Sequence, residues 1–121
     1  MVKHRLLIAL VLVALTFVAH VFALSAGWIW DDNDYITANQ LIQSSDGLSS
    51  IWMPGATPQY YPLVFSGFWI EHALVGLEPT LYHLDNILLH AASVLLLWRV
   101  LVQLGVVHAF WIAALFAVHP M

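Results

Sequence analysis

The stretch from Leu6 to Leu24, LLIALVLVALTFVAHVFAL, decides the fold class of this chain, because only Thr16 and His20 interrupt its apolar side chains. A run of this length crosses the roughly 30 Å hydrocarbon core of a bilayer as a helix. Soon after it comes the sequence Trp30-Asp31-Asp32-Asn33-Asp34-Tyr35, which places three carboxylates within four residues. We therefore expect a membrane-spanning helix that leads into an acid cluster at the membrane surface.

The composition points to the same class. Hydrophobic residues make up 62% of the chain and charged residues only 8%, whereas about a quarter of the residues of a soluble domain are charged. The chain has no cysteine, which excludes disulfides and thiolate metal sites. Its three Lys and Arg residues are too few for a phosphate-neutralising patch, so nucleic acid is excluded as a partner.

The charges are sharply partitioned along the chain. Lys3 and Arg5 precede the first apolar run and Arg99 lies late in a second one, while all seven acidic residues fall between Asp31 and Asp85. The positive-inside rule therefore places the N-terminus in the cytoplasm and the acidic loop outside. The membrane would be the plasma membrane in a bacterium and the endoplasmic reticulum in a eukaryote.

A cleaved signal peptide is the alternative for the first run, since small residues stand at Ala23 and Ser25. The run is longer than the apolar core of such a peptide, which favours an uncleaved span. Either way, the following segment faces the outside.

The whole chain, 1–121, is expected to be a single incomplete transmembrane domain of an all-α integral membrane protein. The first span covers about 6–29, an external loop about 30–79, and a second span about 80–104. Pro79 favours the start of that second helix and Gly105 its end. A third apolar run, about 106–121, has only part of the roughly 20 residues that a span needs. We therefore expect an N-terminal fragment that is inactive by itself.

The loop over 30–79 is too long and too apolar for a plain connector. Short helices are expected within 37–45 and around 48–52, and a longer apolar helix over 63–77. That last helix is interpreted as lying in the outer interface. The alternative, a true span, would put Arg99 outside, and the absence of Lys or Arg near Gly76–Pro79 argues against it.

The acid cluster is the first candidate for chemistry. Neighbouring carboxylates at a low-dielectric boundary raise one another's pKa, so Asp31, Asp32 or Asp34 is suited to accept a proton. The alternative is a solvated acid cluster without a catalytic role.

A second candidate lies on the second span, where His83, Asn86 and His90 recur at helical spacing on one face. Polar groups inside a membrane usually face a cavity or the interior of a helix bundle. They are interpreted as lining an active-site cavity, with interhelical hydrogen bonding as the alternative. A haem or metal held by His83 and His90 is a weaker third reading, because two ligands do not make a metal site. No cofactor is expected, and the sequence does not determine a metal requirement.

An ordered series of short motifs resembles the N-terminal part of multi-spanning GT-C glycosyltransferases. Within that class the chain looks like the protein O-mannosyltransferases with C-terminal tetratricopeptide repeats and their bacterial relatives. The motifs run through Trp30-Asp31-Asp32, Tyr35-Ile36-Thr37, Asn39, Gly47-Leu48, Ile51-Trp52, Tyr60-Tyr61-Pro62-Leu63, Trp69, Gly76, Pro79, Tyr82-His83-Leu84, Asn86, Leu89-His90, Phe116-Ala117 and His119-Pro120.

The resemblance implies a truncated GT-C-like bundle and transfer of a sugar, mannose in the named family, from a polyprenyl-phosphate donor to a protein or glycan acceptor outside the cytoplasm. Asp31 or Asp32 would be the general base. The expected substrate contacts are Asp34, Tyr35, Tyr61, His83, Asn86 and His90. Membrane lipid is the remaining expected partner.

This chain departs from the family pattern in two ways. It supplies far fewer spans than such enzymes have, and no Lys or Arg on the predicted outer side holds a donor phosphate. A small non-enzymatic membrane protein whose outer loop binds a partner is therefore the alternative function.

Overall fold

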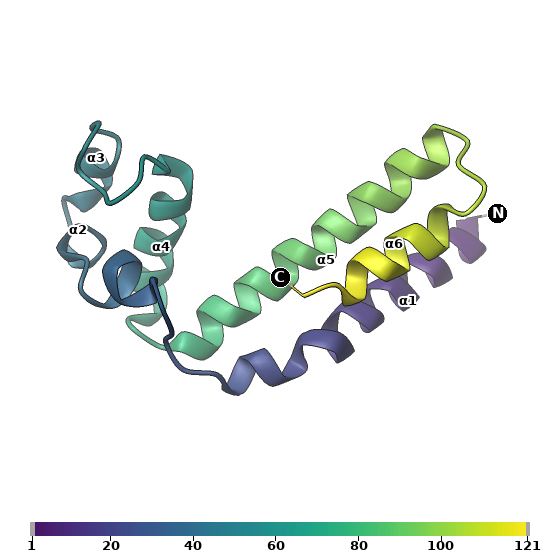
Figure 1. Ribbon diagram of the computed structural model, residues 1–121, viewed down its shortest axis with the longest axis horizontal. Helices are drawn as coiled ribbons and strands as arrows, with labels where there is room; N and C mark the ends of the chain where they lie inside the picture. The colour runs from purple at the N-terminus through teal and green to yellow at the C-terminus, as the bar shows by residue number, and fades with distance from the viewer. Residues whose placement is uncertain (1, 121) are drawn as a thin grey trace. The chain divides into compact units, whose positions relative to one another are not determined.

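The computed structural model describes residues 2–120, and every regular element in this part of the chain is helical. The elements in chain order are α1 (Val2–His20), η1 (Val21–Ser25), η2 (Asn33–Thr37), α2 (Gln40–Gln43), α3 (Gly47–Ile51), α4 (Pro62–Val75), α5 (Pro79–Gln103) and α6 (Ala109–Val118) (Figure 1). The expected all-α fold class is thus confirmed.

Two helical segments, Lys3–Ser25 and Pro79–Gln103, are long and apolar enough to cross a membrane. In the first, α1 continues into the 3-10 helix η1, and helical backbone ends at Ser25, whereas the apolar pattern predicts a span to about residue 29. The Ser25 hydroxyl donates to the Phe22 carbonyl at 2.9 Å, and Gly27, a poor helix former, follows closely. The position of these helices in a membrane stays a prediction.

Both predicted end signals of α5 are confirmed. Pro79 is its first residue, where a missing N–H costs nothing. At the other end Gly105 has a φ of 73°, the Gly105 N–H donates to the Val102 carbonyl at 3.2 Å, and the Val106 N–H donates to the Leu101 carbonyl at 3.0 Å. These two bonds form a Schellman motif, which stops the helix at a glycine in the left-handed conformation.

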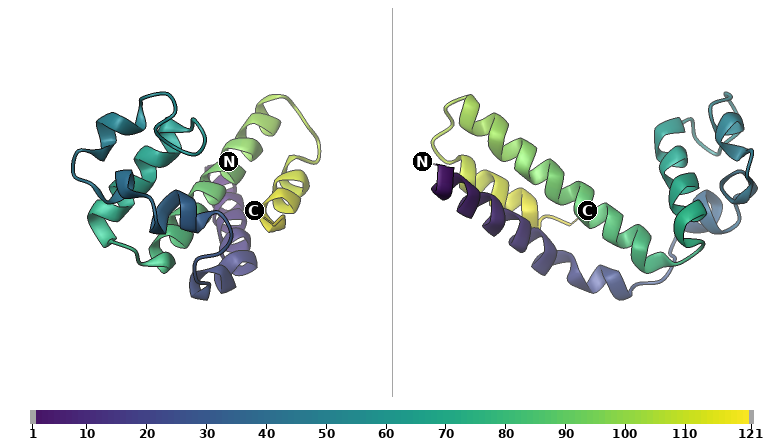
Figure 2. Two further views of the ribbon diagram at one scale, coloured as in Figure 1. Left: turned by 60° about the vertical axis from the view of Figure 1, so that its left-hand side comes forward. Right: turned by 180° about the vertical axis from the view of Figure 1, so that it is seen from behind.

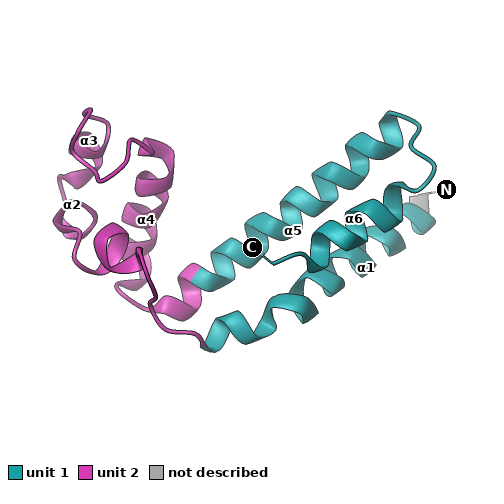
Figure 3. Cartoon of the chain, viewed as in Figure 1, with its two compact units in different colours: residues 1–25, 83–121 teal, residues 26–82 magenta. Residues whose placement is uncertain are grey.

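The chain forms two compact units (Figure 3), residues 1–25 with 83–121 (unit 1) and residues 26–82 (unit 2). In unit 1, α1, the unit 1 part of α5 and α6 lie side by side, and α5 runs antiparallel to the other two (Figures 1 and 2). Buried alanines at Ala109, Ala113 and Ala117 recur every four residues along α6. Two of them join Leu12 of α1 and Val94 of α5 in the core. Small side chains at this spacing allow helix backbones to approach closely.

The outer surface of unit 1 is also apolar. Leu6 is 60% exposed, Leu96 63% and Leu115 71%, one on each of the three helices. The bundle therefore buries little of its hydrophobic surface within itself. Large exposed apolar surfaces of this kind indicate contact with a membrane or with another protein.

The alanine stripe leads to a first testable prediction. Ala113→Leu introduces three carbon atoms at a position with no exposed surface, so we expect the free energy of unfolding in detergent to fall by about 1–3 kcal/mol through overpacking. The matched control is Ala92→Leu, an exposed alanine on α5. Thermal unfolding of the two variants checks this, and equal stability of both would contradict the packing of α6.

Unit 2 has a core of its own. Ile42 of α2, Ile51 of α3 and Phe65 of α4 are buried together, and Phe68 and Trp69 pack against them. The indole N–H of Trp69 donates to the Ser44 carbonyl at 2.7 Å, and that of Trp52 donates to the Ser66 hydroxyl at 3.2 Å. The apolar segments of the predicted loop thus form a small helical unit rather than a connector.

The helices of unit 2 follow the predicted ones with shifted bounds. α3 overlaps the predicted 48–52 region but begins and ends one residue earlier, and α4 covers most of the expected helix over 63–77. The expected helix within 37–45 is shorter, because the Asn39 side chain accepts the Leu41 N–H at 3.0 Å and so begins a new helix there.

Gly47, the first residue of α3, carries the second prediction. A Cβ at this position would overlap the backbone carbonyl of Leu41, so any side chain forces α2 and α3 apart. We expect Gly47→Ala to lower the local stability of unit 2 by about 1–3 kcal/mol, as for other overpacked sites. The matched control is Gly67→Ala in α4, where no atom lies within 4 Å and alanine favours the helix.

Hydrogen exchange of the amides in residues 40–66 measures this stability. Faster exchange in Gly47→Ala and unchanged or slower exchange in Gly67→Ala is the expected result. Unchanged exchange in Gly47→Ala would show that the close approach to Leu41 does not exist.

Candidate functional site

The acid cluster begins with a tight turn closed by two hydrogen bonds. The Asp32 N–H donates to the Ile29 carbonyl at 3.1 Å, and the Ile29 N–H donates to Asp32 Oδ2 at 2.8 Å. Asp32 thus bonds Ile29 through both its backbone and its side chain. The short polar side chain of aspartate suits this kind of turn.

The turn holds Trp30 in an unusual conformation. Its φ is 51°, and it is the only residue other than glycine with a positive φ among those described. Its side chain is 93% exposed, so side-chain packing does not maintain this conformation, whereas the two bonds between Ile29 and Asp32 do. Backbone strain of this type costs about 1–3 kcal/mol and gathers at functional sites.

Asp31 and Asp32 therefore differ in their surroundings. Asp31 follows Trp30 directly and is exposed, whereas Asp32 is half-buried. Within residues 2–120 no hydrogen-bond donor contacts the Asp31 carboxylate, and its backbone carbonyl accepts the Tyr35 N–H at 2.9 Å. The Asp31 carboxylate is thus available to a substrate, whereas the Asp32 carboxylate maintains the turn.

Asp34 and Tyr35 lie in the π-helical turn η2, which directly follows the acid turn. The Tyr35 hydroxyl donates to Gln59 Oε1 at 2.7 Å, and its ring packs edge-on against Phe65 with centroids 5.4 Å apart. The pKa of the Tyr35 phenol is raised above its usual value, mainly by desolvation and to a smaller extent by the negative charge of Asp31. Tyr35 is therefore a neutral hydrogen-bond donor at physiological pH.

Tyr61 also belongs to this region. Tyr61 and Asp34 are further, smaller electrostatic causes of the raised pKa of the Tyr35 phenol, and Tyr61 is about half exposed. Its backbone carbonyl accepts the Phe65 N–H at 3.0 Å, at the start of α4. Unit 2 thus brings together Asp31, Asp32, Asp34, Tyr35 and Tyr61.

An open hollow of about 420 Å³ lies beside the acid turn and is lined by Trp28, Ile29, Trp30, Asn33 and Thr37. Thr37 donates to Asn33 Oδ1 at 2.7 Å, which fixes the polar side of the hollow. Aromatic rings next to amide and hydroxyl groups suit a ligand with both apolar C–H faces and hydroxyl groups. The sequence interpretation did not include these lining residues in the site, although Trp30 stands next to the acids.

The predicted residues of α5 belong to unit 1. His83 and His90 are half-buried there, whereas Asn86 is exposed. His90 Nε2 lies 3.1 Å from the Phe116 carbonyl, and its ring lies 4.9 Å from that of Phe116. This interaction joins α5 to α6, as the alternative interpretation of these residues, interhelical hydrogen bonding, predicts for His90.

His20 is a polar residue of unit 1 that was not predicted as a site residue. Its ring lies 5.2 Å from that of His90 in an edge-to-face arrangement. His20 Nδ1 lies 2.9 Å from the Thr16 carbonyl and Nε2 lies 3.2 Å from the His119 carbonyl. Because a carbonyl oxygen only accepts, the neutral ring donates one of these bonds and the imidazolium donates both. Its position inside an otherwise apolar run is the sequence signal that could have identified it.

Metal binding finds no support from side-chain geometry. In the region that the structure covers, 2–120, no three His, Asp or Glu residues are placed to hold a metal ion.

Comparisons with known proteins support the family drawn from the ordered motifs. No family model and no solved structure matches the chain. Protein O-mannosyl-transferase Tmtc1 of Drosophila melanogaster is 33% identical over 122 residues, which cover 88% of this chain and 14% of the fly protein. Protein O-mannosyl-transferase F38B6.6 of Caenorhabditis elegans is 26% identical over 93% of the chain and 18% of the worm protein.

Protein O-mannosyl-transferase TMTC2 of Homo sapiens is 34% identical over 65% of the chain. The chain therefore spans less than a fifth of the length of each of these relatives. Because the similarity to the fly protein extends over most of this chain, the chain is homologous to the N-terminal region of the TMTC protein O-mannosyltransferases.

Proposed function

We propose that this chain supplies the catalytic carboxylate of a membrane glycosyltransferase, which transfers a sugar from a polyprenyl-phosphate donor to a hydroxyl-bearing acceptor outside the cytoplasm. The homology supports the reaction class, because the relatives are named protein O-mannosyl-transferases. The observation that carries the proposal is the environment of Asp31, exposed next to a strained Trp30 and without a hydrogen-bond donor among the described residues.

The chemistry that this arrangement suits is an inverting displacement. The Asp31 carboxylate accepts the proton of an acceptor hydroxyl, and the hydroxyl oxygen forms a bond to the anomeric carbon of the sugar. The bond between that carbon and the phosphate oxygen breaks, and the lipid phosphate leaves with the electron pair. A fixed carboxylate contributes to such a step both by accepting the proton and by orienting the acceptor.

Asp32 and Tyr35 have supporting roles in this proposal. Asp32 maintains the turn that presents Asp31, through its bond with the Ile29 N–H. The phenol of Tyr35 is protonated at physiological pH, and desolvation and then Asp31 raise its pKa further, so Tyr35 does not act as a base and its hydroxyl remains a donor, to Gln59 in this structure. We assign Asp34 and Tyr61 to the substrate side of the same cluster.

The hollow beside the turn is suited to a sugar ring or to the acceptor segment. Its indole rings offer flat apolar surfaces, and Asn33 and Thr37 offer hydrogen bonds. We assign His83, Asn86 and His90 of unit 1 to contacts with the lipid-linked donor, since polar side chains in an apolar helix usually line a pathway or cavity.

A set of substitutions in the complete gene product tests the general base. We expect Asp31→Asn to lower kcat/KM for sugar transfer by about 10²–10⁴-fold, the usual contribution of a general base. Asp32→Asn keeps an oxygen that accepts the Ile29 N–H, so its kcat/KM should fall less than that of Asp31→Asn. Asp32→Ala removes this acceptor and opens the turn, so its kcat/KM should fall further than that of Asp32→Asn. Asp46→Asn, an exposed acid elsewhere in unit 2, is the matched control and should be fully active.

The assay measures transfer of labelled sugar from a polyprenyl-phosphate donor to an acceptor peptide in proteoliposomes. Full activity of both Asp31→Asn and Asp32→Asn in correctly inserted protein would show that neither is the base. Absence of any transfer by the unmodified protein, together with retention of a bound partner, would instead favour the non-enzymatic alternative.

The predicted topology has its own test, because the chain contains no cysteine. Asp46→Cys should react with a membrane-impermeant maleimide in intact cells or microsomes oriented with the outer face exposed. Lys3→Cys should react only after permeabilisation, and the unmodified protein measures the background. The reverse pattern would place the acid cluster on the cytoplasmic side and exclude the proposed reaction.

A further inference from the structure

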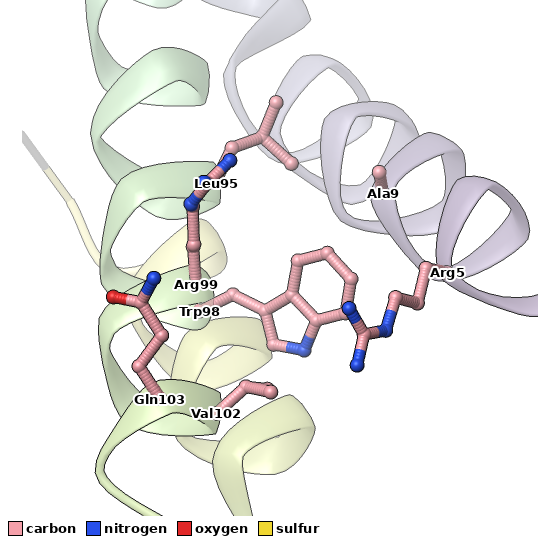
Figure 4. A pocket seen from close by; sticks show the side chains of 7 residues that line it. All are labelled: Arg5, Ala9, Leu95, Trp98, Arg99, Val102 and Gln103. Atoms are coloured by element: carbon pink, nitrogen blue, oxygen red, sulfur yellow. The ribbon is translucent and has the colours of Figure 1, made fainter. Parts of the chain in front are cut away.

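A groove of about 390 Å³ lies between α1 and α5 within unit 1. It is lined by Arg5, Ala9, Leu95, Trp98, Arg99, Val102 and Gln103. Figure 4 shows the Trp98 indole extending from α5 into the space between the two helices, with the Arg5 side chain of α1 directed toward it. None of these residues belongs to the site proposed above.

The groove concentrates positive charge. The chain has three Lys and Arg residues in all, and two of them, Arg5 and Arg99, line this one groove although they lie on different helices. No acidic residue lines it. Within the described part of the chain neither guanidinium has an ion-pair partner, and both side chains are exposed. The two positive charges are thus without a neutralising group from unit 1.

The position of Arg5 adds to this excess of positive charge. It lies near the start of α1, whose first turn contains no acidic residue. The N-terminal end of a helix carries a partial positive charge, so basic residues there are unfavourable unless an anion is nearby. An anion in the groove would interact favourably with both the guanidinium groups and the helix end.

The remaining lining residues determine what kind of anion fits. Ala9, Leu95 and Val102 make most of the wall apolar, and the neighbouring helix surface is apolar as well, with Leu6 and Leu96 more than half exposed. Trp98 has an apolar ring with one N–H donor, a combination favoured at the level of lipid headgroups. A freely soluble anion would gain nothing from these apolar walls.

We propose that this groove binds an anionic phospholipid of the leaflet at the N-terminal end of α1. Its phosphate lies between Arg5 and Arg99, Gln103 donates a hydrogen bond to the headgroup, and an acyl chain follows the apolar wall past Leu95 and Ala9. Basic pockets between spanning helices on the cytoplasmic side are known to bind such headgroups. This inference depends on unit 1 lying in a membrane and not on the sugar-transfer reaction.

The test compares lipid binding by the complete gene product in detergent, with phosphatidylglycerol and phosphatidylcholine as probes and native mass spectrometry as the readout. We expect the unmodified protein to retain phosphatidylglycerol in preference to phosphatidylcholine. The double variant Arg5→Gln/Arg99→Gln should bind phosphatidylglycerol about 25-fold more weakly, from about fivefold for each basic residue at a membrane surface. Its binding of phosphatidylcholine should not change.

Two further variants make the test specific to the groove. Lys3→Gln removes one positive charge from the same helix end without touching the groove and should leave the lipid preference unchanged. Gln103→Lys adds a third positive charge to the groove and should strengthen phosphatidylglycerol binding by about fivefold. This gain of binding remains informative even if the double variant folds poorly.

Four results would overturn the proposal. Equal loss of lipid in Lys3→Gln would indicate a general surface charge effect. If free glycerol phosphate, at the same concentration as phosphatidylglycerol, displaced that lipid from the protein, the groove would be a site for a soluble phosphate. No preference for phosphatidylglycerol in the unmodified protein, or no gain in Gln103→Lys, would show that the groove is not a site for an anionic phospholipid.

Discussion

Charged groups are very costly to bury in an apolar environment without a partner, and this constraint organises the whole chain. Unit 1 satisfies it by keeping Arg5 and Arg99 exposed in a groove near one end of α1 and α5. The acid cluster satisfies it by lying outside the apolar run that forms α1 and η1. The segment between them is almost entirely apolar and forms a helix, which satisfies its own backbone hydrogen bonds.

A second constraint acts on the acid turn. Closing the turn with two bonds between Ile29 and Asp32 holds Trp30 at a positive φ and leaves the side chain of Asp31 exposed. Two neighbouring aspartates thus acquire different environments from the geometry of one turn. The proposed division of roles, with Asp31 as the base and Asp32 as the residue that positions it, follows from that difference.

The histidines of unit 1 illustrate how helix packing changes the interpretation of a sequence pattern. Spacing along α5 groups His83, Asn86 and His90, but packing joins His90 to His20 of α1 and to the end of α6. Polar side chains that meet between apolar helices both stabilise the contact and specify its register. The buried alanines of α6 also contribute, because their small side chains allow the helices to approach closely enough for the His90 and Phe116 rings to interact.

The sequence by itself determined the all-helical class, the two long apolar helices, the start of α5 at Pro79 and its end at Gly105. These follow from local properties, such as hydrophobic run length, the missing N–H of proline and the left-handed conformation of glycine. The approximate place of α3 and α4 could also be predicted, because their apolar runs are bounded by glycine and proline.

Only the tertiary structure decided the rest. It distinguished Asp31 from Asp32, placed Trp28, Asn33 and Thr37 around a hollow, and revealed the early end of helical backbone at Ser25. It also brought Arg5 and Arg99 to one groove and His20 to His90. Each of these depends on contacts between residues that are distant in sequence, or on a side chain that bonds the backbone across a turn. No periodicity or composition encodes such contacts, because they arise only when the helices pack.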